Sequence, residues 1–272
     1  IIPTLRNIFR NYDDGTWIAW RRVEHSESVD IERIGMQEPS PFTLCRIPLH
    51  DTHISSFYHV TSKESFWPIL HTFPTHFNVN NADWSIFEEV NLRFAEAACE
   101  EAAEGATVWV HDYNLWLAPG YIRERRPDLK IAFFHHTPFP GNDVFAILPW
   151  REQILESLLC CDVVGFHIPR YTENFARAAS TLVGANRGPK VPVDKKFITV
   201  GTALSEGTVT SQLEHKGRCV RLLSSPVGTS PDVIQELSWS AAVENHGELI
   251  VQDTKKGRKL ILSASRVDYT KG

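Results

Sequence analysis

The sequence predicts an α/β protein with a doubly wound, mainly parallel sheet, and residues 108–175 carry most of that prediction. Three short apolar runs in this stretch alternate with segments of helical character, the order expected of right-handed βαβ units. In open α/β sheets, ligands bind at the edge where the carboxyl ends of the strands meet. We therefore expect the chemistry of the protein to lie in the polar groups that end the three runs: His111 and Asp112, His135 and His136, and His167.

The composition is that of a soluble globular protein, with 42% apolar and 22% charged residues in 272. No apolar run approaches the ~18 residues that cross a bilayer, and the start does not look like a signal peptide. A formal charge of −5 gives no general attraction to nucleic acid or anionic lipid. The sequence therefore predicts no membrane partner and no nucleic-acid partner, and it leaves a homo-oligomer open.

The cysteines are odd in number and show no CxxC spacing; they stand at positions 45, 99, 160, 161 and 219. Cys160 and Cys161 end an apolar helical stretch, where we expect buried free thiols rather than a vicinal disulfide or a metal site. The cytosol fits this cysteine usage best.

The first part of the chain predicts a helix over 3–11 and then a strand over 16–23. A helix before a strand at the very start, without an initiator Met, suggests that an earlier strand precedes Ile1. Residues 24–41 are polar and are expected to form a surface excursion before a strand over 42–49.

Two amphipathic helices are predicted next, over 57–74 and 83–103, and Asp83 is expected to cap the second. Most aromatic residues of the first helix fit a core. Tyr58 and Trp67 also carry hydrogen-bonding groups, which are common where one end of a side chain faces a wet pocket. Their role stays open between core packing and ligand binding.

The central stretch predicts, in order, the strand 107–111, the helix 114–124, the strand 130–135, the stiff loop 137–140, the helix 149–160, the strand 162–167 and the helix 170–182. An exposed loop is expected within 184–216, then a strand over 219–223 and a helix capped by Ser230. A last strand over 260–264 runs into Arg266 and Lys271, as many phosphate-binding loops begin. We expect residues 1–225 to form one domain and residues 226–272 to be a linker and the first strand of a second, truncated one.

Asp112 and the nearby imidazoles allow two kinds of chemistry. Three or four imidazoles with a carboxylate suit zinc or iron and would support hydrolysis, although HExxH and HxH spacings are absent. As a sugar or phosphate site, Asp112 would accept hydrogen bonds from hydroxyls, and a neutral His136 would orient a hydroxyl or polarise a leaving group. A third possibility is that these residues only tie strand ends to loops.

Six segments carry a resemblance to known enzymes: HDYNLWLAP, FFHHTPFP, ILPWREQILESLL, DVVGFHIPRYTENF, PVGTSP and SRVDYTKG. In order and spacing they resemble the trehalose-phosphate synthase family of retaining nucleotide-sugar glucosyltransferases. The resemblance implies the N-terminal, acceptor-binding half of a B-type glycosyltransferase, which has two Rossmann-like domains facing a cleft. Within the family, FYHVTSKESFWPILH and HDYNLW look most like the branch that moves glucose from ADP-glucose to glycerol 3-phosphate. Asn114 stands where trehalose-phosphate synthases usually have His.

The resemblance also implies residue roles. Tyr58 and Trp67 match contacts to the acceptor phosphate, Asp112 matches a carboxylate near the reacting sugars, and His136 matches the imidazole on the donor glucose. Arg266 and Lys271 match the basic pair on the donor diphosphate, where two fixed cations stabilise the departing phosphate. The resemblance leaves little expectation of a chemical role for His111, His135 and His167.

Front-face transfer with retention is implied, without a metal or cofactor and without the paired carboxylates of glycosidases. The family's first strand with its glycine loop is expected before Ile1, and its donor domain after Gly272, so we expect this chain alone to have little activity. The alternatives are a trehalose-6-phosphate synthase that uses glucose 6-phosphate, a catalytically silent homologue and, more distantly, a metal-dependent hydrolase.

Overall fold

The computed structural model describes residues 15–24, 30–36, 42–194, 206–228, 235 and 267–271. Two compact units divide the chain, Ile1–Pro226 and Val227–Gly272. The sheets, the helices and the candidate site described below belong to the first unit. The predicted helix over 3–11, the Ser230 cap and the strand over 260–264 lie outside the described residues.

A six-stranded mixed sheet with the order β4-β5-β6-β11-β10-β7 forms the centre of the first unit. Its first four strands are parallel to one another, and β10 pairs antiparallel with both β11 and β7. This mainly parallel arrangement confirms the predicted fold class. The bounds are β4 (Thr107–His111), β5 (Lys130–His135), β6 (Val163–Phe166), β11 (Arg218–Ser224), β10 (Gln212–His215) and β7 (Asn186–Arg187).

Two smaller sheets accompany the central one. In the first, β3 (Phe42–Leu49) lies between β1 (Thr16–Arg22), to which it is parallel, and β2 (Glu32–Met36), to which it is antiparallel. The second pairs β8 (Lys190–Pro192) with β9 (Thr208–Thr210). The predicted strands over 42–49, 107–111 and 130–135 are therefore confirmed at both ends.

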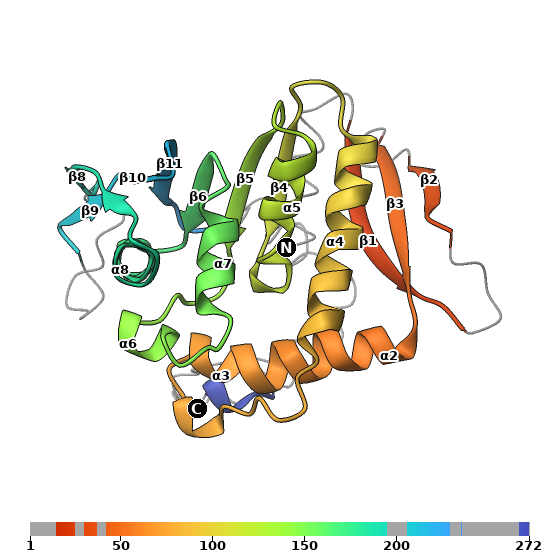
Figure 1. The fold of residues 1–272 in the computed structure, drawn as a ribbon, viewed down its shortest axis with the longest axis horizontal. Coiled ribbons are helices and arrows are strands. Elements are labelled where there is room, and N and C mark those ends of the chain that lie inside the picture. The colour runs from red at the N-terminus through yellow and green to blue at the C-terminus, as the bar shows by residue number, and fades with distance from the viewer. Residues whose placement is uncertain are drawn as a thin grey trace, which may run out of the picture. The chain divides into compact units, whose positions relative to one another are not determined.

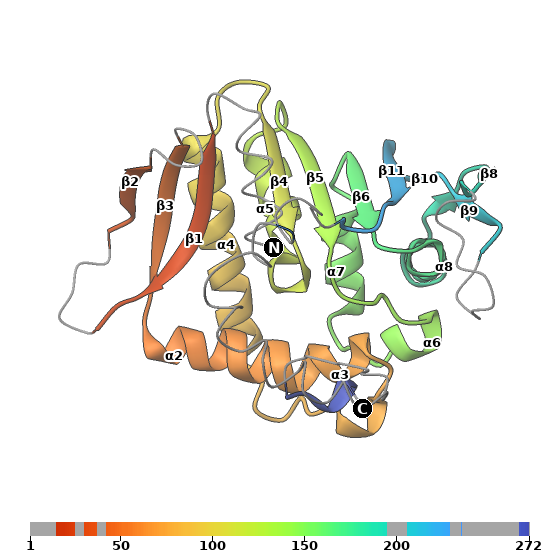
Figure 2. The same cartoon turned by 180° about the vertical axis from the view of Figure 1, so that it is seen from behind.

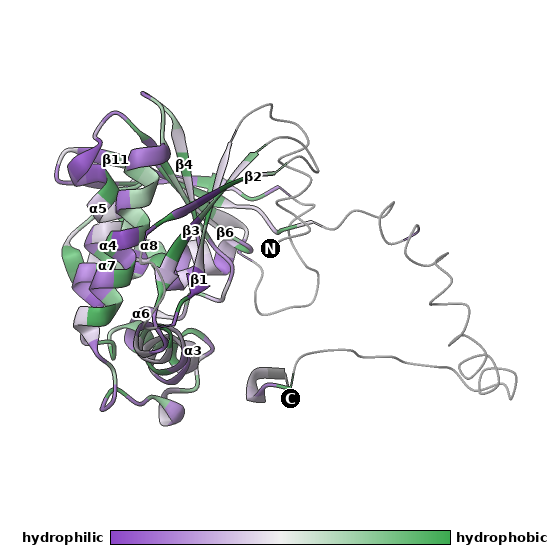
Figure 3. Cartoon of the chain, turned by 90° about the vertical axis from the view of Figure 1, so that its right-hand side faces the viewer, coloured by the Kyte–Doolittle hydropathy of each residue, from purple (hydrophilic) through white to green (hydrophobic). Residues whose placement is uncertain are grey.

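Three amphipathic helices cover one face of the strands: α4 (Trp84–Glu101), α5 (Ala118–Arg125) and α7 (Arg151–Leu158). They stand in front of the sheet in Figure 1 and behind it in Figure 2. Hydrophilic and hydrophobic stretches alternate along them (Figure 3). Asp83 caps α4 as predicted, because its carboxylate accepts hydrogen bonds from the backbone N–H groups of Ser85 and Ile86.

Residues 51–70 form one helical segment that Figure 1 shows crossing the edge where β3 ends. The segment comprises α2 (Asp51–His53), a π-helix η1 (Ile54–Phe66) and α3 (Trp67–Leu70), followed by the 3-10 turn η2 (Pro74–His76). The prediction of an α-helix over 57–74 was therefore wrong in its first residue and in the number of residues per turn. The Ser62 hydroxyl donates to the Phe57 carbonyl, five residues back, at 2.8 Å, and this bond supports the wider turn.

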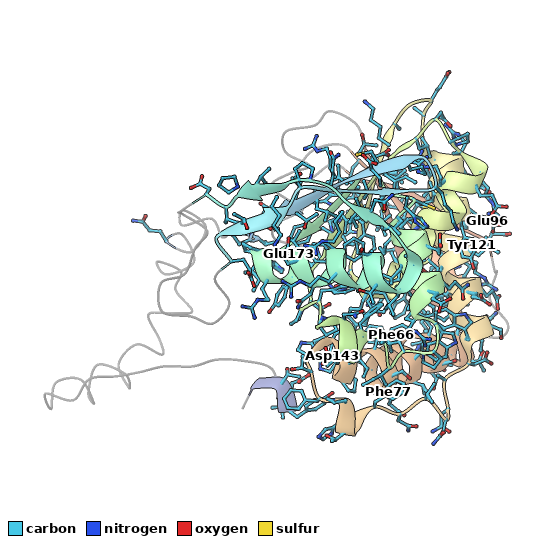
Figure 4. The ribbon with its side chains drawn as sticks, turned by 60° about the vertical axis from the view of Figure 1, so that its left-hand side comes forward. Phe66, Phe77, Glu96, Tyr121, Asp143 and Glu173 are labelled. Atoms are coloured by element: carbon cyan, nitrogen blue, oxygen red, sulfur yellow. The ribbon has the colours of Figure 1, made fainter. Side chains whose placement is uncertain are left out.

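A cluster of aromatic side chains anchors this segment to the helices and strands. Phe66 is fully buried, and its ring centroid lies 5.1 Å from that of Phe87 on α4 and 4.9 Å from that of Trp116. Figure 4 labels Phe66 among these side chains. The Trp84 and Trp150 rings stack at 4.3 Å. Buried aromatic contacts of this kind dominate core energetics, so they fix η1 over the strand ends.

The structure corrects three further predictions. The polar stretch 24–41 contains β2, which pairs with β3 while the Arg46 guanidinium donates to Glu32 at 2.9 Å. The expected helix over 114–124 is split into a 3-10 turn η3 (Tyr113–Leu115) and α5, because Pro119 has no N–H to continue a helical ladder from η3.

Residues 184–196, expected to form an exposed loop, contain β7 and β8, and β9 and β10 follow within 208–215; these four short strands are polar and mostly exposed. They are held by α8 (Pro169–Val183), where the Glu173 carboxylate is 1% exposed. This carboxylate accepts from Arg187 at 2.7 Å and lies 3.3 Å from the Lys190 ammonium. The ion pairs thus join α8, labelled at Glu173 in Figure 4, to β7 and β8.

All five cysteines are free thiols, as expected for Cys160 and Cys161; Cys161 is buried as predicted, whereas Cys160 is only half-buried. Among the described residues, no helix combines the length and the apolar character that crossing a membrane requires.

Candidate active site

The carboxyl ends of β4, β5 and β6 bring the predicted polar groups together. These strands are neighbours, with His111 in register with Phe134 and His135 with Phe166. The His111 Nδ1 and His136 Nε2 atoms lie 3.1 Å apart, and the His136 and His167 ring centroids lie 5.8 Å apart. We call Asp112, His111, His136 and Thr137 the carboxyl-edge cluster.

Asp112 holds a backbone conformation that side chains rarely adopt, with φ 68° and ψ 168°. This region is nearly restricted to glycine and costs on the order of 1–3 kcal/mol. The Asp112 Oδ1 atom accepts a hydrogen bond from the backbone N–H of His136 at 3.1 Å and one from the Thr137 hydroxyl at 3.3 Å. Strain maintained by such contacts is typical of functional sites, and here it presents a carboxylate beside His136.

His135 is a structural residue that holds the loop after β5. Its side chain is fully buried, and burial lowers the pKa of its imidazole. The Nδ1 atom lies 2.9 Å from the Thr137 carbonyl, which can only accept, so Nδ1 carries the proton. The Thr137 hydroxyl, 3.1 Å from the same nitrogen, is then left to donate to Asp112. His135 therefore supports Asp112 through Thr137.

His111 and His136 are neutral imidazoles at physiological pH. The pKa of each is lowered to about 4, mainly by burial; the neighbouring His136 adds to the lowering for His111, and the Asp112 carboxylate partly opposes it for His136. Burial likewise lowers the pKa of His167. In a hydrogen bond between two neutral imidazoles, one nitrogen donates and the other accepts, so His111 fixes the tautomer and the ring orientation of His136.

Tyr58 and Trp67 lie on the helical segment over the strand ends, Tyr58 half-buried on η1 and Trp67 only 6% exposed at the start of α3. Lys63 lies between them, with its Nζ atom 5.3 Å from the Tyr58 ring centroid and 4.3 Å from the Trp67 centroid. The same atom donates to the Tyr113 hydroxyl at 3.3 Å. Since Tyr113 directly follows Asp112, Lys63 connects the aromatic pair to the carboxyl-edge cluster.

The second unit holds the remaining predicted residues. Lys271 belongs to the 3-10 turn η5 (Tyr269–Lys271), and Arg266 lies outside the described residues. The structure therefore brings together Asp112 and His136, and Tyr58 and Trp67, each pair within the first unit. The roles of these four residues, and those of Arg266 and Lys271, stay predictions.

Two residues that the sequence did not single out belong to the site, Lys63 and Thr137, and His111, whose role the resemblance had reduced, belongs to it through its contact with His136. The signal for His111 was its place at a strand end. Thr137 follows His135 and His136 in the stiff loop, which was expected to fix the imidazoles. Lys63 gave no signal, because the spacing of five from Tyr58 does not place two side chains on one face of an α-helix.

Metal ligation was the alternative chemistry for these imidazoles. In the part of the chain that the structure describes, no group of three or more His, Cys, Asp or Glu side chains is placed to hold a metal ion. The closest imidazole pair, His111 and His136, forms a hydrogen bond instead.

The model of Glycosyltransferase family 20 matches residues 2–272. The chain belongs to this glycosyltransferase family. It is 48% identical, over its whole length, to the glucosylglycerol-phosphate synthase of a Synechocystis strain, and it covers 55% of that protein. It is 36% identical over 95% of its length to the trehalose-6-phosphate synthase of a Mycobacterium strain and covers 49% of that one.

The family 20 fold is confirmed by solved structures. A UDP-forming α,α-trehalose-phosphate synthase from Burkholderia xenovorans superposes with a TM-score of 0.75 at 20% identity, covering 98% of this chain and 54% of that one. The resemblance to the trehalose-phosphate synthase family, and within it to glucosylglycerol-phosphate synthases, is therefore confirmed. The chain spans about half the length of the curated relatives it matches.

Proposed function

We propose that the full-length protein transfers glucose from ADP-glucose to glycerol 3-phosphate, which gives glucosylglycerol phosphate for compatible-solute synthesis. The observation that carries this proposal is the 48% identity over the whole chain to a glucosylglycerol-phosphate synthase, against 36% to a trehalose-6-phosphate synthase. Donor, acceptor and retention of the anomeric configuration are parts of this proposal, as are a cytosolic location and the domain division at residues 225 and 226.

Asp112 is proposed to bind a sugar hydroxyl of the reacting pair. Its Oδ1 atom is engaged by His136 N–H and the Thr137 hydroxyl, while Oδ2 accepts no hydrogen bond from the described residues. An ionised carboxylate oxygen is a strong acceptor for a hydroxyl donor. The fixed Oδ1 therefore orients Oδ2, which positions the sugar without a further rearrangement.

His136 is proposed to contact the donor glucose as a neutral imidazole. Its Nε2 atom is engaged by His111, and the depressed pKa keeps the ring uncharged at pH 7. A neutral ring can accept or donate at its other nitrogen, Nδ1. Arg266 and Lys271 are proposed to hold the donor diphosphate, where negative charge develops as the glycosidic bond breaks.

The departing phosphate is proposed to take the proton of the acceptor hydroxyl on the same face of the sugar, so that configuration is retained. Neither a metal ion nor a cofactor enters this proposal. We also propose that residues 1–272 alone have little or no transferase activity, because the relatives they match are about twice as long. Turnover by the isolated 272 residues would contradict that part.

A coupled assay of ADP release by the full-length protein tests the proposal. With ADP-glucose as donor, we expect turnover with glycerol 3-phosphate and a clear preference for it over glucose 6-phosphate. The opposite preference would replace our proposal by trehalose-6-phosphate synthesis. Intact substrate binding without turnover would indicate a catalytically silent homologue, and a stoichiometric transition metal in an elemental analysis would favour a hydrolase. Proton NMR of the first product formed reports the anomeric configuration.

A further inference from the structure

We propose that Asn91, on α4, is a positioning residue that holds the Asp112 carboxylate in place for the transfer step. The inference rests on the proposed function and deepens it, since it names what keeps Asp112 in its working conformation. The Asn91 side chain is fully buried, so it touches neither substrate. It acts through residues 112–118, which we call the β4–α5 turn.

The first argument is that Asn91 makes four hydrogen bonds, three of them to the β4–α5 turn. Its Oδ1 atom accepts from the backbone N–H groups of Leu117 at 3.0 Å and of Ala118 at 3.1 Å. Its Nδ2 atom donates to the Asn114 carbonyl at 3.1 Å and to the Phe87 carbonyl of α4 at 3.0 Å. A primary amide has two N–H donors and an oxygen with two lone pairs, so all of its bonding positions are used. One side chain therefore fixes the turn at three points.

The second argument is that the turn depends on these bonds, because the residue at the start of α5 is apolar. The first N–H groups of a helix have no partner within the helix. Leu117 occupies the N-cap position, and its side chain cannot accept a hydrogen bond. Asn91 supplies the acceptor from α4, which stands beside α5 in Figures 1 and 2. Since a buried N–H group without a partner is unfavourable, removal of Asn91 should let the turn rearrange.

The third argument is that Asp112 is the first residue of this turn and has a strained backbone. Its N–H donates to the Phe134 carbonyl of β5 at 2.9 Å, and its carbonyl accepts from the Leu115 N–H, within the turn, at 3.1 Å. A residue at φ 68° and ψ 168° stays there only where its surroundings over-determine the conformation. Once Asn91 no longer holds the turn, Asp112 can return to a negative φ, which moves its carboxylate away from the His136 N–H.

The test uses the full-length protein with Asn91→Leu, Asn91→Asp and, as a matched control, Ser157→Ala. Leu branches at the same carbon as Asn but forms no hydrogen bond. Asp keeps an acceptor for the N–H groups of α5 and loses the Nδ2 donor, so it replaces Leu if the Leu variant does not fold. Ser157 of α7 is 7% exposed, and its Oγ atom accepts from the Gly120 N–H of α5 at 2.9 Å. The control therefore also removes a buried polar contact to α5, but one outside the β4–α5 turn.

Hydrogen exchange at the His136 amide reports the position of the Asp112 carboxylate without any assay of activity, because this N–H donates to Asp112 Oδ1. Mass spectrometry with fragmentation to single residues measures the exchange rate, and Asp112→Ala gives the rate without the acceptor. We expect folded Asn91→Leu to exchange roughly tenfold faster than the parent at this amide, the scale of one lost hydrogen bond, and Ser157→Ala to exchange at the parental rate. A parental rate in folded Asn91→Leu would overturn the inference.

Steady-state kinetics test whether the effect passes through Asp112. We expect the kcat of Asn91→Leu to fall roughly tenfold to a hundredfold, as for a small misplacement of a reacting group, with both KM values within about threefold. Ser157→Ala should keep the parental kcat. Adding Asn91→Leu to Asp112→Asn should lower kcat less than about twofold further, because both substitutions act on one carboxylate. Losses that multiply in the double variant would show a separate role for Asn91 and contradict the inference.

The exchange measurement separates failure of this inference from failure of the proposed function. If exchange at His136 rises while the kcat of Asn91→Leu stays parental, the positioning of Asp112 is supported and the role of Asp112 in transfer is lost instead. If the full-length protein prefers another acceptor, the kinetic comparison is made with that acceptor. If no acceptor turns over, the proposed function fails, and the exchange rates of the folded variants alone decide the inference.

Discussion

The two edges of the parallel strands carry similar His and acidic side chains, but these side chains are ion-paired to different extents. At the amino edge, the Glu156 carboxylate lies 3.0 Å from His215 Nε2 and 2.8 Å from Lys216 Nζ. Asp162 accepts from the Arg123 guanidinium and from the Ile131 N–H, both at 2.7 Å. We call Glu156, Asp162 and these partners the amino-edge cluster.

In the described part of the chain, the carboxyl-edge cluster has no such ion pairs to balance its negative charge. Asp112 has no Arg or Lys partner there, its backbone is strained, and its neighbouring imidazoles are desolvated and neutral. A hollow is lined by Asn186 and residues 214–219 at the amino edge, where charges are already paired. A cluster of His and acidic residues therefore indicates a chemical role only where its charges lack ion-pair partners and its backbone is strained.

A large loss of activity is expected from His136→Phe. The ring keeps its contacts with Phe134 and His167, while both nitrogens are lost, so the fold should persist and kcat/KM should fall about a hundredfold, as for the loss of one positioned polar group. The matched control is His215→Phe in the amino-edge cluster, which should lose some stability and no activity. Steady-state kinetics and thermal melts of the full-length protein measure both. Equal activity losses in the two variants would remove the distinction between the edges.

The second effect is expected from Asp162→Asn. The amide keeps one acceptor oxygen but loses the charge that pairs with Arg123, so the free energy of unfolding should fall by roughly 1–2 kcal/mol. Urea denaturation checks this value. Transferase kinetics should stay within about twofold of the parent, because the residue lies at the far edge of the sheet. A tenfold loss of kcat in a folded Asp162→Asn protein would contradict a purely structural role.

A third, smaller effect concerns the strain at Asp112. Glycine adopts φ 68° without a steric penalty, so Asp112→Gly should relieve part of the ~1–3 kcal/mol of strain. The two lost hydrogen bonds, to the His136 N–H and the Thr137 hydroxyl, oppose that gain by roughly 1–3 kcal/mol. We expect the variant to be inactive and about as stable as the parent in thermal melts. A marked loss of stability would mean that the Asp112 carboxylate serves the fold rather than the chemistry.

The smallest effect is the pH dependence of stability. His111 and His136 have folded pKa values of about 4 against about 6.5 for an unfolded His, so the unfolded state binds more protons between these values. Their contribution is fully present above pH 6.5 and is lost as the pH falls towards 4. His136→Phe should therefore flatten the stability profile in that window.

The amino edge should titrate in a different window. Burial would raise the pKa of Glu156, but hydrogen bonds from Lys216 and His215 outweigh it and lower the pKa. Its contribution is present above the unfolded pKa of about 4.3 and is lost below it. Glu156→Gln should therefore lower the urea midpoint above about pH 4.3 and approach the parent below it, whereas the difference between His136→Phe and the parent should change between pH 6.5 and 4. Coincident windows would show that the two edges are not electrostatically distinct.

The sequence predicted the elements whose patterns are strong and local. β3, β4 and β5 are apolar runs with polar ends, and Asp83 is a cap with a helical stripe behind it, so these were found with their bounds. β2 and β7 were missed because polar edge strands are defined by their partners rather than by their own alternation. The carboxyl-edge position of Asp112 and His136 followed from strand order alone.

Other parts of the site depend on geometry that a sequence pattern does not carry. The positive φ of Asp112 is unexpected for a non-glycine residue, and the hydrogen bond between His111 and His136 depends on the register of β4 and β5. Lys63 was missed because a 13-residue π-helix has no sequence signature, and its neighbours were assigned with the α-helical period. Tertiary contacts around Phe66 hold this unusual turn in place.

We infer that the carboxyl edge, and not the amino edge, performs the chemistry. The most direct measurement compares Asp112→Asn with Asp162→Asn in the full-length protein, by the release of ADP from ADP-glucose in the presence of glycerol 3-phosphate. Both substitutions remove one carboxylate charge and keep its shape. We expect folded Asp112→Asn to lose roughly a hundred- to a thousandfold in kcat and Asp162→Asn to keep the parental rate. Parental activity in Asp112→Asn, with a loss confined to Asp162→Asn, would contradict it.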